Sequence, residues 1–377
     1  MAELFNSDGA SDELTDLLRL SLVSGIGPRL RQLLLERFET PAAIFAASPS
    51  ELRSVPGIGG KLAGAVARAR AEIDVDAELD LCRKRQVSIV PQDGAGYPRA
   101  LQEIADPPGL LFVRGAIEPR DALSIAVVGS RHATRYGLMI AERLAASLSR
   151  AGLTVVSGLA RGIDAAAHRG ALAAGGRTIA VLGSGVLNIY PPEHATLASE
   201  IMARGAVVGE APVRSAPLSG AFPQRNRLIS GMSLGVVIVE AALHSGALIT
   251  ARHAMEQGRE VFAVPGPVDS RMSRGCHQLI RDGAKLVETA DDVLEELGPL
   301  VAAAPREDGS VVHHPAELLL NEAEQRILSA VGTSATAIDQ VIADSGLPTP
   351  QVLSTLSVLE MRRLVKRLSG NYVLRVS

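Results

Sequence analysis

Guanidinium groups, hydroxyls and glycine amides gather in four short segments of this sequence. These segments contain Gly129, Ser130 and Arg131; Gly158 and Arg161; Arg225, Asn226 and Arg227; and Ser245 with Gly246. Each guanidinium can donate two hydrogen bonds to one phosphate, and small residues leave backbone NH groups accessible to an anion. Several such groups along one groove would neutralise a run of backbone phosphates. The four segments therefore predict a polyanion site, although each arginine alone could equally form a structural ion pair.

Fewer residues could perform acid–base or nucleophilic chemistry. Asp164 and His168 lie four residues apart, and we expect Asp164 to cap a helix and His168 to bond a buried partner. Glu240 ends an apolar run, where it could act as a general base or orient neighbouring arginines and hydroxyls. No helix start with a paired histidine and acid surrounds Cys276, so we expect a buried apolar residue there. The sequence therefore predicts no catalytic residue.

The usual cofactor and metal motifs are missing from the sequence. It contains neither G-x-G-x-x-G with an acidic residue after the second strand nor G-x-x-x-x-G-K-[ST]. His313 and His314 have no further ligands at metal spacing, and Cys82 and Cys276 form no C-x-x-C pair. We therefore predict no cofactor and no metal site.

Seven apolar runs separated by helical segments indicate the elements that position these residues. The runs are SIAVVGS, LTVVSGLA, TIAVLGSG, AVVGEAP, LGVVIVEA, EVFAVPG and KLVE. Runs without alternation predict strands buried on both faces, and the intervening helices make such strands parallel. We therefore expect an α/β fold with an extended, doubly wound, Rossmann-like parallel sheet in residues 76–300, including a short first strand at Val87 to Val90. Loops at the carboxyl edge of such a sheet lead into helix N-termini that favour anions.

The N-terminal region contains an internal repeat. SLVSGIGPRLRQLL at 21–34 is echoed by RSVPGIGGKLAGAV at 53–66, and residues 17–70 hold eight cations against three carboxylates. Gly25 and Gly27, then Gly57 and Gly59, permit a tight hairpin between two helices, whose exposed amides suit a phosphate. Residues 1–75 therefore resemble a tandem helix-hairpin-helix, SAM-like domain, with these glycines and Lys61 as secondary DNA-binding candidates. A helical protein-contact domain of the same shape is the alternative.

The C-terminal region predicts a small winged-helix domain after an irregular linker at 301–319. In residues 320–377, Asn321 with Glu324 predicts a capping box, Thr336 a second helix cap, and Thr349 followed by proline a third helix start. LVKRL and YVLRV then predict a two-stranded wing. The secondary DNA-binding candidates here are Arg362, Arg363 and Lys366. Such modules also bind proteins.

Composition limits the classes of function. The 377 residues are 47% hydrophobic and 21% charged, which is typical of two or three globular domains. The net charge of −3 means that nucleic-acid binding would depend on local basic patches. Six phenylalanines, four tyrosines and no tryptophan limit stacking on rows of bases. We expect no membrane span or secretion signal, and two isolated cysteines favour a reducing cytoplasm.

A set of longer phrases occurs in one order between residues 97 and 290. They are YPRALQEIADPPGLLFVRG, IAVVGSRHATRYG, VVSGLARGIDAAAH, IAVLGSGVLNIYPPEH, FPQRNRLISG, VVIVEA, SGALITARHAMEQGREVFAVPG and GCHQLIRDGA. Together they resemble the bacterial DNA-processing protein A family, also called DprA or Smf. The resemblance implies a non-enzymatic protein that binds and protects incoming single-stranded DNA during natural transformation (competence). It also implies loading of the RecA recombinase for homologous recombination, and a homodimer formed through the α/β domain.

The resemblance implies that the ten residues of the four segments form the DNA-binding site. Three positions depart from the family pattern: Cys276 replaces a usual Asn, Leu187 a common Asp, and Ala247 a usual Ser. These changes alter local hydrogen bonds and leave the arginines intact. We expect sequence-tolerant binding with a steep salt dependence, since each phosphate contact on a single strand contributes a slope of about −0.7. The terminal domains could add binding of double-stranded DNA.

Two other classes of function are consistent with parts of the pattern. A nucleotide-phosphate hydrolase of the lysine-decarboxylase-like group would use Glu240 as base, but VVIVEAALHSGALIT lacks the P-G-G-x-G-T-x-x-E phrase of those enzymes. A winged-helix transcription regulator would need base-reading residues early in the helix at 349–362. Only Gln351 fits that role.

Overall fold

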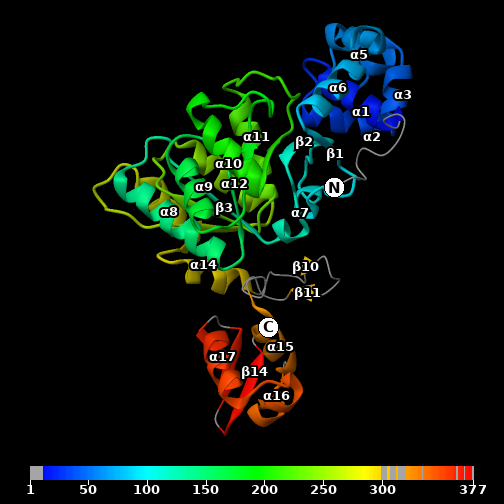
Figure 1. Ribbon diagram of the computed structural model, residues 1–377. Helices are drawn as coiled ribbons and strands as arrows, with labels where there is room; N and C mark the ends of the chain where they lie inside the picture. Colours follow the sequence, from blue (N-terminus) through cyan, green and yellow to red (C-terminus); the bar gives the residue numbers. More distant parts are fainter. Residues whose placement is uncertain are drawn as a thin grey trace.

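The computed structural model describes residues 12–298, 304–305, 311–312, 320–332, 334–361, 364–368 and 370–375 (Figure 1). It contains a helical N-terminal domain, a central α/β domain and a small C-terminal domain, which confirms the predicted fold class. Most of the expected linker at 301–319 lies outside the described residues, and its described parts pair as strands β10 (Ala304–Pro305) and β11 (Val311–Val312). No described helix is long and apolar enough to cross a membrane.

The central sheet has nine strands in the order β1-β2-β6-β5-β4-β3-β7-β8-β9. They are β1 (Ser88–Pro91), β2 (Leu110–Gly115), β3 (Ser124–Gly129), β4 (Thr154–Ser157), β5 (Thr178–Leu182), β6 (Ala206–Gly209), β7 (Gly235–Val239), β8 (Glu260–Ala263) and β9 (Lys285–Leu286). The seven predicted runs form β3 to β9 and pair in parallel, as expected. The sheet is not parallel throughout, because β2 pairs antiparallel with β6 and with β1.

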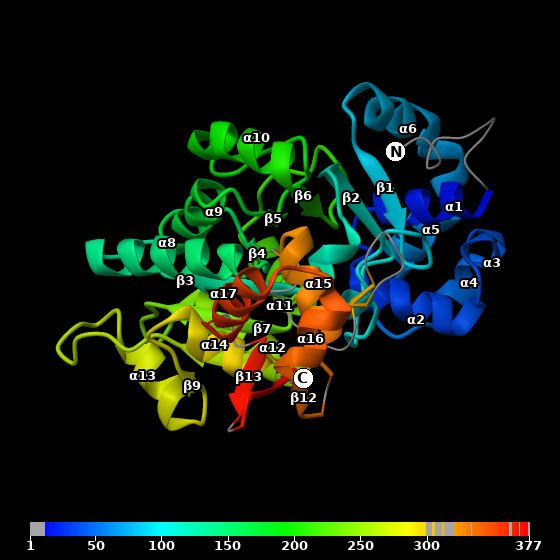
Figure 2. The same ribbon diagram turned by 60° about the horizontal axis from the view of Figure 1, so that its bottom comes forward.

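Helices cover both faces of this sheet, as the unbroken apolar runs require (Figure 2). In β3, Ile125 and Val127 face one helical layer, while Ala126 and Val128 face the other. The first layer consists of α8 (Arg135–Arg150), α9 (Ile163–Ala173), α10 (Ala195–Arg204) and α14 (Ala290–Leu297). The second consists of α7 (Arg99–Gln102), α11 (Ala221–Gly231), α12 (Gly246–Glu256) and α13 (Arg274–Arg281). Two short 3-10 helices, η1 (Pro119–Ala122) and η2 (Pro192–His194), complete the domain.

The N-terminal domain forms the two predicted hairpins. Its helices are α1 (Asp12–Leu22), α2 (Pro28–Phe38), α3 (Pro41–Ala46), α4 (Pro49–Leu52), α5 (Gly60–Glu72) and α6 (Val75–Lys84). Gly25 and Gly57 take φ of 94° and 90°, the left-handed conformation that the hairpins require. Gly27 and Gly59 precede the first residues of α2 and α5. Leu18 of α1 packs with Phe112 of β2, so this domain shares a core with the sheet.

The C-terminal domain has the predicted winged-helix elements and one further strand. They are α15 (Glu322–Ala330), β12 (Thr336–Ala337), α16 (Ile338–Ser345), α17 (Thr349–Met361), β13 (Val365–Leu368) and β14 (Tyr372–Arg375). The capping box of Asn321 and Glu324 is confirmed. The expectation that Thr336 caps a helix is wrong. Thr336 lies in β12, which pairs with β14, and its hydroxyl bonds Gly332 and Ser334.

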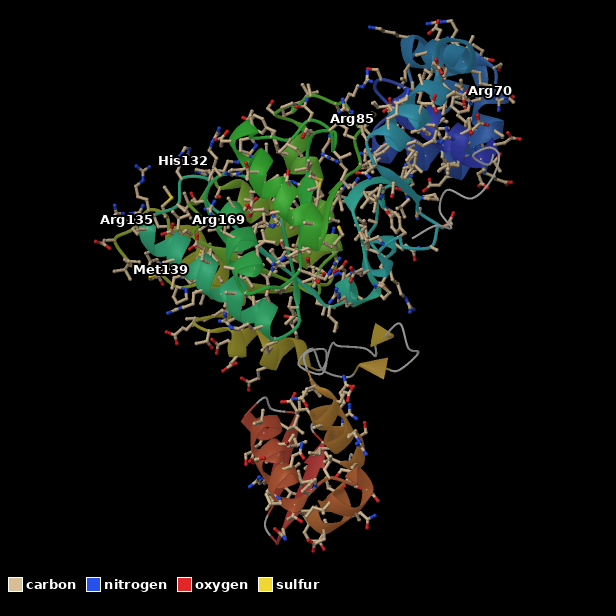
Figure 3. All side chains as sticks on the ribbon, in the orientation of Figure 1. Arg70, Arg85, His132, Arg135, Met139 and Arg169 are labelled. Atoms are coloured by element: carbon tan, nitrogen blue, oxygen red, sulfur yellow. The ribbon has the colours of Figure 1, made fainter. Side chains whose placement is uncertain are left out.

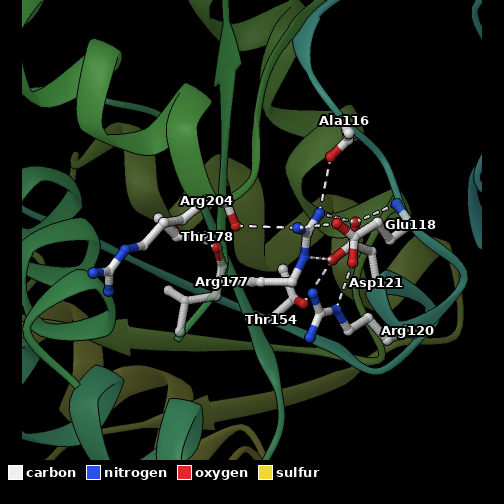
Figure 4. Close-up of polar contacts among 9 residues, drawn as sticks. Ala116, Glu118, Arg120, Asp121, Thr154, Arg177, Thr178 and Arg204 are labelled. Carbon is white, nitrogen blue, oxygen red and sulfur yellow. Dashed lines mark hydrogen bonds and ion pairs between the residues drawn. The ribbon is translucent and has the colours of Figure 1, made fainter. Parts of the chain in front are cut away.

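A partly buried arginine network fixes the amino end of the parallel strands (Figure 4). Arg177, just before β5, donates hydrogen bonds to both carboxylate oxygens of Asp121 and to Glu118. It also donates to the backbone carbonyls of Ala116 and Arg204. These contacts use all five guanidinium N–H donors, so the network ties η1, β5 and α10 together.

Candidate nucleic-acid interface

A cleft of about 890 Å³ lies at the carboxyl ends of the parallel strands. Its walls are the loops that follow β3, β7 and β8, together with the first turns of α11 and α12. This is where an open α/β sheet binds ligands, and the volume is within the usual range for ligand pockets. Seven of the ten predicted residues line the cleft: Gly129, Ser130, Arg131, Arg225, Asn226, Ser245 and Gly246.

The loop after β3 is held in place by Glu240. Ser130 N donates to the Glu240 carbonyl over 2.8 Å, and the buried Glu240 carboxylate accepts from both Thr134 N and Thr134 Oγ1. Thr134 in turn caps α8 by accepting from Gly137 N. A side chain at Gly137 would overlap the Glu240 carboxylate. Of the two roles left open by the sequence, these contacts support the orienting one, because the carboxylate is already bonded to the loop.

Arg131 presents its guanidinium at the cleft beside two aromatic rings. The guanidinium carbon lies 5.1 Å from the centroid of the Phe222 ring, and the Phe222 and Tyr190 ring centroids are 5.7 Å apart. Arg131 is exposed and has no ion-pair partner among the residues that the structure describes. The sequence shows only that aromatic residues are few, with ten in the chain. The structure gathers two of the ten at this cleft.

Two further arginines in the cleft were missed by the sequence analysis. Arg271 and Arg274 follow β8, line the cleft and are exposed, and no carboxylate in the described ranges pairs with them. His132, before α8, and His244 also line it, and Figure 3 shows His132 near the start of that helix. A usable signal was present, because SRMSRG follows the strand EVFAVPG and so must lie at the same sheet edge.

Arg225 lines the cleft, but its guanidinium is not free to donate two hydrogen bonds to one phosphate. Its side chain is only 6% exposed, and Nη1 donates to the carbonyls of Gly158 and Val181. Burial lowers the pKa of Arg225 to about 10. A side chain at Gly158 would overlap the guanidinium. Arg225 and Gly158 therefore fix the loop after β4 from inside the protein.

Arg161 and Arg227 lie outside the cleft lining, so the four predicted arginines do not form one row. Arg227 is 4% exposed and pairs with Asp106 at 3.0 Å and Glu210 at 2.6 Å. Arg161 is exposed and pairs with Glu193 at 2.5 Å, which lowers the pKa of that carboxyl. Arg227 is turned inward because α11 packs its two arginines into the interior beside Leu228 and Ile229.

The other candidate groups have structural partners. His168 is fully buried with Nδ1 2.6 Å from Thr178 Oγ1, and burial lowers its pKa to about 3. Asp164 accepts from the backbone NH groups of Gly158 and Ala160, so it bonds the preceding loop rather than capping its own helix. Burial raises the pKa of Asp164 and raises that of Cys276 to about 11. The predicted buried roles of His168 and Cys276 are confirmed.

The three departures from the family pattern sit in packed surroundings. Cys276 is fully buried, with Sγ 3.6 Å from the Ile238 carbonyl. Leu187 is partly buried against an apolar cluster, and Ala247 is 6% exposed in the first turn of α12. All three are therefore compatible with the core.

The secondary candidates belong to the terminal domains. The hairpin glycines and Lys61 lie at the starts of α2 and α5, and Lys61 is exposed. Lys366 is exposed on β13, while Arg362 and Arg363 lie outside the described residues. Within the described part of the chain, no group of three or more His, Cys, Asp or Glu side chains could hold a metal ion.

Comparison with known proteins agrees with this architecture. The model of the family described as DNA recombination-mediator protein A matches residues 88–298, which is more than half of the chain. The DprA winged helix domain model matches residues 312–371, and the SAM-like helix-hairpin-helix tandem model matches residues 15–71. These matches cover all three domains in order.

Individual relatives support the same assignment. Protein Smf of Escherichia coli is 41% identical over 299 residues, covering 78% of this chain and 80% of its own. The X-ray structure of DNA processing protein A from Streptococcus pneumoniae has a TM-score of 0.63 at 36% identity, covering 74% of this chain and 95% of its own. The structure of DNA processing protein A from Helicobacter pylori, described with its single-stranded DNA binding mode, has a TM-score of 0.51 at 29% identity. It covers 56% of this chain and 95% of its own. The chain therefore belongs to the DNA recombination-mediator protein A family, that of the DprA and Smf proteins.

Proposed function

We propose that this chain binds single-stranded DNA in the cleft at the carboxyl edge of its sheet during natural transformation. The observation that carries the proposal is the set of exposed arginines there, Arg131, Arg271 and Arg274, which have no carboxylate partner in the described part of the chain. Exposed guanidinium groups around one cleft, with no ion pair to a described carboxylate, suit a run of phosphates. The H. pylori relative, described with a single-stranded DNA binding mode, supports the same ligand class.

The shape of the cleft favours a single strand over a duplex. Its volume of about 890 Å³ suits a few nucleotides rather than a double helix. Phe222 and Tyr190 lie beside Arg131, where an unpaired base could stack on a ring while the guanidinium holds the phosphate. A duplex keeps its bases stacked on each other, so it would gain only the phosphate contacts.

We propose that the protein acts by binding rather than by catalysis. Glu240, the base of the hydrolase alternative, is buried and bonded to Thr134. His168 is buried against Thr178 with its pKa lowered to about 3, so it would be a poor general base near neutral pH. These contacts give Glu240 and His168 structural roles.

The family assignment supports a further role for the bound DNA. We propose that the protein protects the incoming strand in the cytoplasm and loads the RecA recombinase on it. A homodimer would present two clefts, which raises the effective concentration of binding groups along one strand. Sedimentation of the purified chain, and recombinase assembly on DNA with and without it, test these two statements.

Binding of labelled oligonucleotides tests the central proposal. Fluorescence anisotropy would compare a single strand with a duplex of the same length, for the natural chain and for Arg131→Ala with Arg274→Ala. We expect preference for the single strand and its loss in the double variant. Arg143→Ala with Arg150→Ala, two exposed residues of α8 outside the cleft, is the matched control. Equal loss in the control, or a duplex preference that survives the cleft change, would refute the proposal.

A further inference from the structure

A second, smaller cavity of about 220 Å³ lies between the N-terminal domain and the sheet. On one side it is lined by the first hairpin, with Gly27 and Arg31. On the other side it is lined by the strand-end residue Gly183 and by Gln224 and Arg225 of α11. Figure 1 shows the helical domain beside α11 and β2. No role assigned so far uses this cavity.

Arg225 lines both the cleft and the second cavity, so the two hollows are neighbours. Its side chain is only 6% exposed, and its Nε has no hydrogen-bond partner in the described residues. Gly183 follows β5, and Glu210, also in the lining, follows β6. The second cavity therefore continues the carboxyl edge of the sheet beyond the cleft.

From this continuity we propose that a single DNA strand held in the cleft runs on along the sheet edge to the hairpin pair of the N-terminal domain. The strand would pass the second cavity, and its following phosphates would bind the first turns of α2 and α5. This inference rests on the proposed function. It assigns the tandem hairpins to the same strand as the cleft, rather than to a separate duplex.

The internal repeat places two equivalent cations at this end of the path. A side chain at Gly25 would meet Leu62, and one at Gly57 would meet Leu30, so each hairpin glycine faces the helix of the other copy. The same offset makes Arg29 the counterpart of Lys61. Both are exposed, and each lies in the first turn of its helix, where unbonded amides and the helix dipole favour a phosphate.

One side chain breaks this symmetry and ties the first hairpin to the sheet. Arg31 Nη2 donates to the Pro107 carbonyl, and a side chain at Gly109 would overlap the Arg31 guanidinium. Arg31 Nη1 is buried and has no partner in the described residues. Its counterpart in the second copy is Ala63, which packs inside the helical domain. The hairpins are therefore fixed relative to the cleft, as a continuous path requires.

The size and lining of the cavity favour one strand. About 220 Å³ is below the usual range for ligand pockets, so it has room for little more than one base. Leu17 and Ile26, which line the cavity and are partly exposed, supply apolar surface for such a base. The Glu210 carboxylate in the wall is paired with Arg227 at 2.6 Å, which offsets its repulsion of a nearby phosphate.

A length series of oligonucleotides tests the path. The intact chain and the variant Arg29→Glu with Lys61→Glu would be titrated with oligothymidylates from about 6 to 40 nucleotides. We expect equal affinity for the shortest strands and at least a tenfold loss in the variant for the longest. The salt slope for long strands should become shallower by about 1.4, since two phosphate contacts are lost. Circular dichroism would verify the fold of each variant.

The control carries the same charge change in the same domain. Arg37→Glu with Arg68→Glu alters two exposed residues away from the hairpins and should leave the length dependence unchanged. Equal loss in both variants, or equal binding by natural chain and hairpin variant at all lengths, overturns the inference alone. Loss of duplex binding without loss on long single strands overturns it too. If the natural chain binds no single strand at any length, the proposed function fails as well.

Discussion

The two ends of the same parallel sheet use arginine in opposite ways. At the amino end, Arg177 is partly buried and all five of its donors are bonded, with Asp121 and Glu118 balancing its charge. At the carboxyl end, Arg131 and Arg271 are exposed around a cleft and have no carboxylate partner in the described ranges. Charge balance, rather than residue type, therefore separates an arginine that holds the fold from one available to a ligand.

Arg225 lies between these two cases. It is at the cleft, yet its Nη1 bonds the Gly158 and Val181 carbonyls and no carboxylate ion-pairs with it in the described chain. Its buried charge is near Asp164, which bonds the same loop. We interpret Arg225 as a positioning residue that shapes the loop after β4.

The largest expected effect is on the amino-end network. Arg177→Met should lower the free energy of unfolding by roughly 3–5 kcal/mol, because it leaves the buried Asp121 carboxylate without its ion-pair partner. Affinity of the folded variant for single-stranded DNA should stay the same. Urea unfolding measures the first and anisotropy the second. A loss of stability below about 1 kcal/mol would contradict the claim that the Arg177 network holds the fold together.

The opposite outcome is expected at the carboxyl end. Arg271→Ala with Arg274→Ala should weaken single-strand binding by roughly 10- to 100-fold, since each charge-assisted hydrogen bond contributes about 1.5–3 kcal/mol and such contributions are not fully additive. Unfolding should change by only about 0.5 kcal/mol, as is usual for exposed residues. A variant that binds normally but unfolds easily would reverse the assignment of the two ends.

Substitutions of Glu240 test whether the loop that presents Arg131 must be anchored for DNA binding. Glu240→Ala would leave Thr134 N without its acceptor, at a cost of about 1–3 kcal/mol in stability. It should also weaken DNA binding, because the loop that presents Arg131 loses its anchor. Glu240→Gln retains a carbonyl acceptor and should recover most of the binding. Equal loss in both variants would point instead to a need for the negative charge.

The smallest effect concerns pH. His168 has a folded pKa of about 3 against an ordinary value of about 6.5, so the unfolded chain binds more protons between these values. The stability from keeping His168 neutral is present above pH 6.5 and is lost as pH falls. Between pH 6.5 and 5.5 the loss should be about 1 kcal/mol. Comparing natural chain and His168→Gln by urea unfolding isolates this contribution, and parallel curves for the two proteins would exclude it.

The sequence predicted the strands and helices better than it predicted the contacts of the arginine side chains. Unbroken apolar runs identified β3 to β9, and the repeated G-I-G identified both hairpins, because these signals are local. The antiparallel pairing of β2 depends on distant β6 and was not predicted. Arg225 and Arg227 sit on a helix whose buried face is set by tertiary packing, so motif position alone could not reveal their partners. Arg271 and Arg274 were within reach of the strand-edge argument and were missed.

The most direct test of the account is the salt dependence of single-strand binding. The slope of log K against log[salt] would be measured for the natural chain, for the triple variant Arg131→Ala, Arg271→Ala and Arg274→Ala, and for Arg177→Met. The account predicts a slope about two units shallower in the triple variant and no change in the Arg177 variant. An unchanged slope in the triple variant would contradict the claim that these exposed cleft arginines are the DNA-binding groups.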